Sequence, residues 1–195
     1  MNEFHHFLRT RRSVRRFKPD PVPASIVDRI LATTIFAPSA HNLQPWRFAL
    51  IQSGSAKEKL GNALTSKMRA DSEAKGENQA EIENRVNNSL RRIAEAPVII
   101  LLCRDVSAIR TEEPEETTMS IQSVATAGLQ LLLAAHAEGL GGNWICWPLY
   151  AQEAVQDVLK LSTEWQAQAM IFLGFEDEKP KEALRQSVKG LITYR

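Results

Sequence analysis

Residues 119–142, MSIQSVATAGLQLLLAAHAEGLGG, decide the fold because their composition is that of one long helix with an apolar second half. The glycines at positions 139, 141 and 142 end this helix. Its second half is apolar on nearly every side, through Leu129, Leu131, Leu132, Leu133, Ala134 and Ala135. Such a helix must be covered all round. The pattern is compatible with burial of this helix either in the chain's own core or against a second subunit.

The segments around this helix indicate a sheet between helices. Residues 47–52, 98–103 and 169–175 are short apolar runs that favour strands. Residues 66–95 are polar and charged, and we expect solvent-facing helix or a mobile flap there rather than core. Residues 25–37 form a helix with one apolar face, made of Ile26, Val27, Ile30 and Leu31. This order of elements predicts a mixed α/β or α+β domain.

Composition limits the class of protein. The chain has 195 residues, 44% apolar and 24% charged, which suits one soluble domain over residues 1–195. Its 24 basic and 23 acidic residues give no global positive field for nucleic acid and no excess charge for a membrane. Residues 1–8 lack the apolar run of a signal peptide, so we expect a cytoplasmic protein. Cys103 and Cys146 have neither the number nor the spacing of a disulfide framework or a zinc site.

Residues 9–18, RTRRSVRRFK, form a local anion site in this otherwise charge-balanced chain. Guanidinium groups offer fork-shaped donors to phosphate oxygens, and each hydrogen bond to a charged group contributes ~1.5–3 kcal/mol. A solvated basic stretch that pairs with acidic helices, or a nucleic-acid-binding arm, would have the same charge. The arginines around Ser13 are Arg9, Arg11, Arg12, Arg15 and Arg16.

Residues 37–48, APSAHNLQPWRF, form a proline-bounded loop rich in uncharged donors and acceptors. Such groups orient the edge of a heteroaromatic ring without adding charge. Pro, Ser and Asn are also ordinary turn residues, and Trp46 is equally suited to a core. His41 has no carboxylate or cysteine partner nearby in sequence to indicate a triad or a metal site.

Residues 139–150, GLGGNWICWPLY, lead from a glycine turn into an aromatic segment. Trp144, Trp147 and Tyr150 could stack on a planar ligand beside a backbone freed by glycine. The other interpretation is a helix stop followed by core aromatics. The glycines neither follow a predicted strand nor open a helix, which argues against a dinucleotide-binding or phosphate loop.

The order of these three motifs resembles the nitroreductase family of flavin mononucleotide (FMN) enzymes. The motifs are RRSVRRFKPDPVP, then APSAHNLQPWRF, then AAHAEGLGGNWI after the long helix. Within that family the chain looks most similar to the nitroreductase-like domain fused to the ligase that adds glutamate to a deazaflavin coenzyme. The resemblance implies an α+β, nitroreductase-like fold with a central, mostly antiparallel sheet flanked by helices. It also implies a homodimer with the long helix at the interface and a variable helical flap around residues 66–95.

The resemblance assigns an FMN-binding role to residues in each motif. The first motif grips the phosphate and ribityl chain, the second touches the ring and ribityl chain from the partner subunit, and the third passes over the ring near its reactive edge. Arg185 lies where a late basic residue completes the phosphate site, although KPKEALRQSVKG departs from the family's arginine-proline pattern. The implied FMN-binding residues are Arg11, Arg12, Ser13, Arg15, Pro38, Ser39, His41, Asn42, Gln44, Trp144, Ile145, Cys146 and Arg185.

The resemblance also implies the reaction. NADH or NADPH passes a hydride to FMN and leaves, and a small planar acceptor such as a nitroaromatic or a quinone then takes the electrons by ping-pong exchange. The cofactor carries this chemistry, so no side chain has to be a nucleophile or a general base. Two alternatives remain open: a reductase of deazaflavin coenzyme biosynthesis, and a flavin-binding module without turnover.

Overall fold

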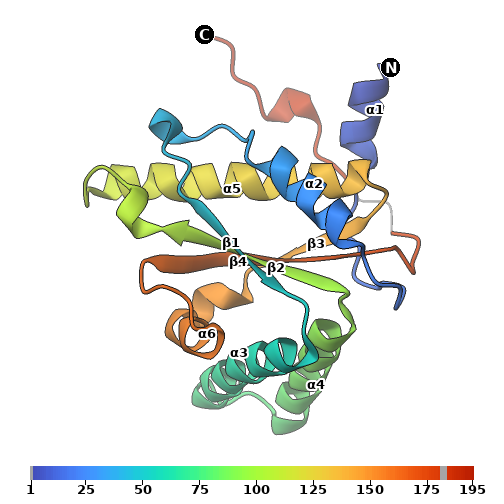
Figure 1. The fold of residues 1–195 in the computed structure, drawn as a ribbon, viewed down its shortest axis with the longest axis vertical. Helices are drawn as coiled ribbons and strands as arrows, with labels where there is room; N and C mark the ends of the chain where they lie inside the picture. The colour runs from blue at the N-terminus through green and yellow to red at the C-terminus, as the bar shows by residue number, and fades with distance from the viewer. Residues whose placement is uncertain (1, 181–183) are drawn as a thin grey trace.

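The structure, a computed structural model, describes residues 2–180 and 184–195 and has a central sheet with helices on both faces (Figure 1). The helices are α1 (Glu3–Thr10), α2 (Ala24–Thr34), α3 (Gly54–Ala74), α4 (Gln79–Glu95), α5 (Pro114–Ala137) and α6 (Gln152–Leu159). The strands are β1 (Trp46–Ile51), β2 (Val98–Asp105), β3 (Gly141–Ile145) and β4 (Trp165–Gly174). The predicted helix and the three predicted strands are therefore present, with ends shifted by a few residues.

The sheet has the order β1-β2-β4-β3, and every neighbouring pair is antiparallel. Side chains alternate between the two faces of a strand, so the fully buried β2 contributes side chains to two separate hydrophobic cores, one on each face of the sheet. Its residues Ile99 and Leu101 belong to one core, and Val98 and Ile100 belong to the other. The prediction of an α+β fold with a mostly antiparallel sheet between helices is confirmed.

Each core lies between the sheet and one layer of helices. The helices α2 and α5 cover one face, and α3, α4 and α6 cover the other (Figure 1). Burying both faces of the sheet removes apolar surface from water at roughly 25 cal/mol per Å² and drives formation of the three layers.

The prediction that residues 66–95 lie outside the core is wrong for one face of α4. Four residues of this helix are buried, namely Ile82, Val86, Ser89 and Ile93. Their spacing of three or four residues is the helical repeat, so the signal was present in the sequence among many charged residues. The charged face of α4 is solvent-exposed, as its composition indicated.

The prediction of a simple glycine turn after the long helix is also incomplete, because residues 141–145 form the edge strand β3. This strand pairs with β4 from Gly141 opposite Gly174 to Ile145 opposite Met170. Two of its five residues are glycines, so it lacks the alternating pattern by which a strand is recognised. The strand forms because it pairs with β4, a tertiary interaction that its own sequence does not indicate.

The chain's own core covers about half of the long helix α5. It starts at Pro114, five residues before the predicted start, with an acidic first turn that suits a helix N-terminus. Length and composition would allow α5 to cross a membrane, but half of its apolar window is buried inside the structure, as in the core helix of a folded domain. Ile121 and Leu129 stay exposed on its outer side.

Candidate functional site

The first motif runs beside the edge strand that carries the third motif. The N–H of Val14 donates a 3.0 Å hydrogen bond to the carbonyl of Gly142, and Ser13 forms a parallel bridge with the same glycine. Val14 is completely buried, and a Cβ on Gly141 would lie 2.8 Å from the Cβ of Val14. Only glycine permits this approach, so Gly141 positions the segment 11–15 against β3.

Three arginines gather where the first motif meets the C-terminal segment. Burial, followed by the nearby charges of Arg12 and Arg185, lowers the pKa of Arg11. Arg12 is held by hydrogen bonds to the carbonyls of Arg9 and Arg11 at 2.5 and 2.9 Å. A cluster of like charges is stabilised by an anion, so the electrostatics of this cluster suit a phosphate group.

Arg15 differs from these arginines in its surroundings. Its side chain is exposed, and its backbone N–H donates a 2.6 Å hydrogen bond to Oε1 of Glu178. This contact fixes the backbone of the motif beside the chain that leaves β4. The guanidinium of Arg15 therefore stays available to solvent or to a ligand.

The second motif has an unusual backbone. His41, Asn42 and Gln44 all have positive φ, at 52°, 56° and 51°. The left-handed region costs a residue other than glycine roughly 1 kcal/mol or more, and such residues gather at functional sites. All three side chains are exposed. The loop thus presents an imidazole and two amides to the surroundings in a conformation that its local sequence does not favour.

Side chains of α5 hold this loop in place. The N–H of Ala40 donates to Oγ of Ser123 at 3.0 Å, and the hydroxyl of Thr126 donates to the carbonyl of Pro38 at 2.7 Å. Within the loop, the N–H of Gln44 donates to Oγ of Ser39 at 3.1 Å. Ser39 is thus a structural part of the loop, at least within one chain.

Trp144, in the third motif, lies against α5 at a glycine. A Cβ on Gly128 would lie 2.0 Å from Cζ3 of Trp144, so this position of the helix leaves room for the indole ring. The indole Nε1 donates to Sγ of Cys146 at 3.0 Å. Ile145 is buried and Cys146 is exposed, so the segment offers a small thiol at the surface beside a fixed aromatic ring.

One chain brings the first motif, the third motif and Arg185 together, and Trp144 of the third motif also packs with Ala37 and Trp46 at the two ends of the second motif. Thr126 contacts the loop 38–44, whereas His136 lies 3.1 Å from the hydroxyl of Thr10, next to the first motif. These two residues of α5 are ten positions apart, which is roughly 15 Å along a helix. The hydrogen bonds of the 38–44 loop thus run to α5 rather than to the arginine cluster.

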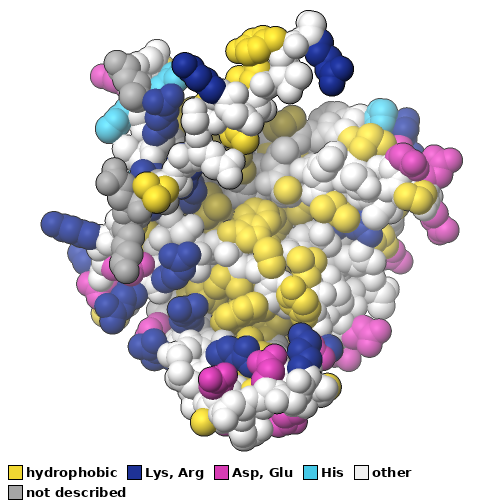
Figure 2. Space-filling view, turned by 180° about the vertical axis from the view of Figure 1, so that it is seen from behind, with side chains coloured by type: hydrophobic (Ala, Val, Ile, Leu, Met, Phe, Trp, Pro, Cys, Tyr) yellow, Lys and Arg dark blue, Asp and Glu magenta, His cyan; other side chains and the backbone are white. Residues whose placement is uncertain are grey.

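One face of the molecule has an apolar hollow with cations beside it. Figure 2 shows hydrophobic side chains gathered in a hollow across the middle of one face, with several Lys and Arg side chains to its left. Such a combination suits a planar ligand with an anionic end.

Several positioning residues were not recognised from the sequence. Ser123 and Thr126 are small polar residues in an otherwise apolar stretch of helix, and this contrast is the signal that could have identified them. Gly128 is a glycine in the interior of a helix, which usually has a packing reason. No sequence signal pairs Val14 with Gly142, because that contact joins residues far apart in the chain.

Comparisons with known proteins establish the family. The family model described as the Nitroreductase family matches residues 8–175, which is most of the chain, and this protein belongs to that family. The fold and all three motifs lie within or next to the matched region. The finer resemblance to the domain of deazaflavin coenzyme ligases stays a prediction.

Two relatives and one solved structure illustrate the range of the family. YfhC of Bacillus subtilis (strain 168), which carries the name of an NAD(P)H nitroreductase, is 26% identical over 95% of this chain and 91% of its own length. The 5,6-dimethylbenzimidazole synthase of Rhodobacter capsulatus is 32% identical over 89% of this chain and 84% of its own length. A protein from Desulfovibrio desulfuricans that carries the name of a nitroreductase was solved in complex with FMN, and it is 26% identical with a TM-score of 0.77, over 100% of this chain and 98% of that one.

The residues present fit the flavin that the family implies. The cluster of Arg11, Arg12 and Arg185 has the charge for a phosphate, and the pKa of Arg11 is already lowered by burial and by its like-charged neighbours. The exposed amides of the 38–44 loop provide uncharged donors and acceptors of the kind that a ring edge needs. Gly141 lets the cationic segment approach the strand that carries Trp144, so cations and an aromatic surface lie close together.

Proposed function

We propose that this protein is an FMN-dependent oxidoreductase that passes electrons from NADH or NADPH to a small planar acceptor by ping-pong exchange. One observation carries the proposal: the cationic segment 11–15 lies directly beside the strand that leads to Trp144 and Cys146. When bound, FMN supplies the two-electron carrier between donor and acceptor. The relative YfhC, which carries the name of an NAD(P)H nitroreductase, and the FMN-containing family structure support this assignment.

In this proposal, the side chains bind and orient rather than react. Arg11, Arg12 and Arg185 hold the phosphate, while Ser13 and Arg15 contact the ribityl chain and the ring. Ile145 and Cys146 flank the ring, and Trp144 fixes their segment against α5 through Gly128. Residues 144–148 contain no carboxylate, so protons reach the reduced acceptor from solvent.

The proposal includes a homodimer whose second copy brings the loop 38–44 to the arginine cluster. The loop is anchored roughly 15 Å along α5 from the first motif, and we propose that its exposed amides reach the ligand held by the first motif of a second copy. Four large apolar side chains are exposed just after the end of α2 and on the outer face of α5, namely Ile35, Phe36, Ile121 and Leu129. Closed twofold pairing is the commonest way for a chain to cover such a face.

The chain ends support the same arrangement. The described residues of α1 include none that is buried, and the C-terminal segment projects from the body (Figure 1). That segment carries exposed apolar side chains at Leu184, Val188, Leu191 and Tyr194. We propose that both ends pack on the second copy, which would bury this apolar surface.

The test is the absorption spectrum of the purified protein, before and after NADH or NADPH is added under argon. We expect a yellow protein with one FMN per chain, bleached by the reduced nicotinamide. A colourless protein that shows no melting shift with added FMN would contradict the assignment. A yellow protein that neither nicotinamide bleaches would instead indicate a flavin-binding module without turnover.

Replacement of both Arg11 and Ser13 with alanine tests which residues hold the flavin. Loss of one hydrogen bond from Arg11 to the phosphate alone costs about 1.5–3 kcal/mol, which is roughly a tenfold to hundredfold weaker affinity for FMN. The matched control is Arg91→Ala, an exposed arginine on α4 on the far side of the sheet. Retention of FMN by the double variant, measured by absorbance after gel filtration, would remove these residues from the site.

The relative from Rhodobacter capsulatus favours a second candidate function, the synthesis of 5,6-dimethylbenzimidazole. Incubation of the protein with FMN and NADPH in air, followed by mass spectrometry, distinguishes this reaction from simple electron transfer. Appearance of 5,6-dimethylbenzimidazole would favour the second candidate. Oxidation of NADPH without that product would favour the first.

A further inference from the structure

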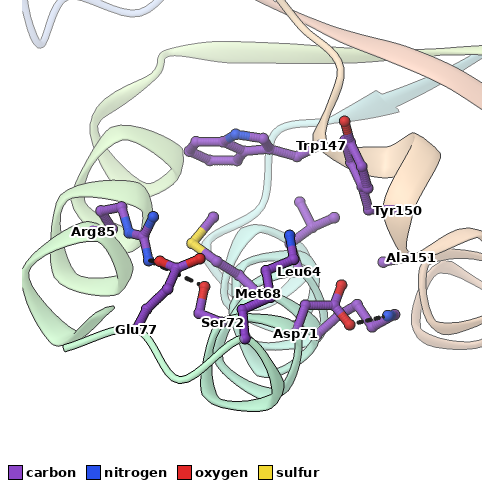
Figure 3. Close-up of a pocket in the computed structure, with 11 residues that line it drawn as sticks. Leu64, Met68, Asp71, Ser72, Glu77, Arg85, Trp147, Tyr150 and Ala151 are labelled. Carbon is purple, nitrogen blue, oxygen red and sulfur yellow. Dashed lines mark hydrogen bonds and ion pairs between the residues drawn. The ribbon is translucent and has the colours of Figure 1, made fainter. Parts of the chain in front are cut away.

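A separate pocket of 210 Å³ lies between α3, the start of α4 and the short helical turn η3 (Trp147–Tyr150) (Figure 3). It belongs to the sheet face that α3, α4 and α6 cover, opposite α5. None of the thirteen predicted flavin-binding residues lines it. Its volume is below the roughly 300–1,000 Å³ of pockets for drug-sized ligands, so it suits a molecule with one or two rings.

The walls of this pocket suit a flat aromatic molecule. Trp147 lies across its top, and Met68 points up from α3 toward the indole ring (Figure 3). Leu64 lies beside Met68, and Tyr150 closes one side with its ring. Aromatic faces and a polarisable thioether both favour contact with a ring, and a slot between them selects planar ligands.

The rim of the pocket carries three cations and two carboxylates. Lys67 pairs with Asp71, and Arg85 pairs with Glu77. Arg85 also donates to Oγ of Ser72 at 3.1 Å, so two contacts fix its guanidinium. Lys75 is the lining cation that takes part in no ion pair within the described residues. The rim therefore has a net charge of +1 and one ammonium group free for a ligand.

We propose that this pocket binds a planar aromatic monoanion, such as an aromatic carboxylate. The ring lies between Trp147 and Met68, and the anionic group lies at Lys75 and Arg85. Because Trp147 directly follows Cys146, the bound molecule lies at the end of the segment assigned to the flavin ring. The binding itself does not depend on the proposed function.

The experiment is calorimetry of the protein as purified, with two probes, 4-nitrobenzoate and its methyl ester. Both are planar nitroaromatics of similar size, and only the first is charged. We expect 4-nitrobenzoate to bind more tightly, and Lys75→Gln to weaken its binding about fivefold while leaving the ester unchanged. The matched control is Lys59→Gln, an exposed lysine of α3, the helix that Lys75 directly follows. Lys59 does not line the pocket, so this variant should bind both probes as the wild type does.

A second variant tests the aromatic wall. Trp147→Phe keeps a ring and should retain both probes, whereas Trp147→Ala should weaken both, with circular dichroism confirming that each variant is folded. Equal binding of acid and ester, or equal losses in the two lysine variants, would overturn the proposal. Competition by excess FMN against 4-nitrobenzoate in flavin-depleted protein would overturn it too, since the pocket would then belong to the flavin site.

The same measurements separate this proposal from the proposed function. A colourless protein that binds 4-nitrobenzoate through Lys75 would contradict the flavin assignment and support the pocket. A yellow protein that NADPH bleaches, but that binds neither probe, would support the flavin assignment and contradict the pocket.

Discussion

Substitution of Gly128 by alanine tests the packing that fixes the third motif. A Cβ at this position would lie 2.0 Å from Cζ3 and 2.6 Å from Cη2 of Trp144, and 2.9 Å from a methyl group of Leu102. All three distances are below ordinary van der Waals contact, so the ring or the helix must move. The nearest atoms belong to a rigid indole ring packed between α5 and the sheet rather than to the end of a flexible side chain.

Two opposing terms set the size of the effect. Overpacking a core costs about 1–3 kcal/mol, and replacing a helical glycine with alanine returns about 1 kcal/mol of helix propensity. The 2.0 Å contact places Gly128→Ala at the upper end of the first range, so we expect a net loss of about 1–2 kcal/mol. For a chain of this size, the Tm should then fall by about 2–8 °C.

The assay is thermal unfolding followed by circular dichroism, with Gly54→Ala as the matched control. Gly54 also lies in a helix, but no atom lies within 4 Å of the point that its Cβ would occupy, so its alanine variant should be unchanged or slightly more stable. Truncation of the ring by Trp144→Leu should make the added methyl group at 128 less costly, which a double-mutant cycle measures. If Gly128→Ala is as stable as Gly54→Ala, then the packing argument for Trp144 is wrong.

Three further predictions concern assembly, pH and thiol chemistry. Leu129→Lys places a charge on the exposed side of α5, and it should convert the proposed dimer to a 21.9 kDa monomer in light scattering and release its flavin. The control Ala80→Lys, on the exposed surface of α4, should leave the dimer and its flavin unchanged. A wild-type chain that is monomeric with flavin bound would refute the dimer. Burial lowers the pKa of His136 below its ordinary value of 6.5, so this imidazole is protonated at a higher pH in the unfolded chain than in the folded one. The free energy of unfolding should therefore fall as the pH drops below about 6.5, and it should level off once the pH is below the pKa of the folded state. His136→Gln should flatten that part of the stability profile, and an unchanged slope would assign it to other groups. Burial raises the pKa of Cys103 to about 12, so a thiol reagent should label Cys146 alone in the native protein and both cysteines after unfolding. Two reactive thiols in the native protein would contradict the burial of Cys103.

Local patterns predicted the elements whose stability is local. The helix at 25–37, the strands at 47–52, 98–103 and 169–175, and the long helix all have a repeat that one segment displays by itself. The strand β3 lacks this repeat because glycines occupy positions 141 and 142, where Val14 and Leu132 approach closely. Glycine is required at these two positions because neighbouring side chains leave no room for a Cβ, and glycine itself has a low propensity for strands.

The same distinction applies to the candidate site. The arginine-rich segment and the aromatic segment are recognisable as charge and ring content, and the structure brings them together through Val14 and Gly142. The sequence could mark Ser123 and Thr126 as polar residues of the long helix, but it could not show that they anchor the loop 38–44, because each contact joins residues more than eighty positions apart. The cofactor and the roles of individual residues came from the resemblance, which local physics alone does not provide.

The backbone of the 38–44 loop links the structure of one chain to the proposed assembly. Three residues other than glycine with positive φ cost the chain roughly 1 kcal/mol or more each, and two hydrogen bonds to α5 offset part of that cost. The result is a fixed display of His41, Asn42 and Gln44 toward solvent. A single chain makes little use of this display, since the contacts of the loop run to α5 and within the loop itself. Strain of this kind is retained where a ligand or a second chain uses the geometry, and both are part of the proposed function.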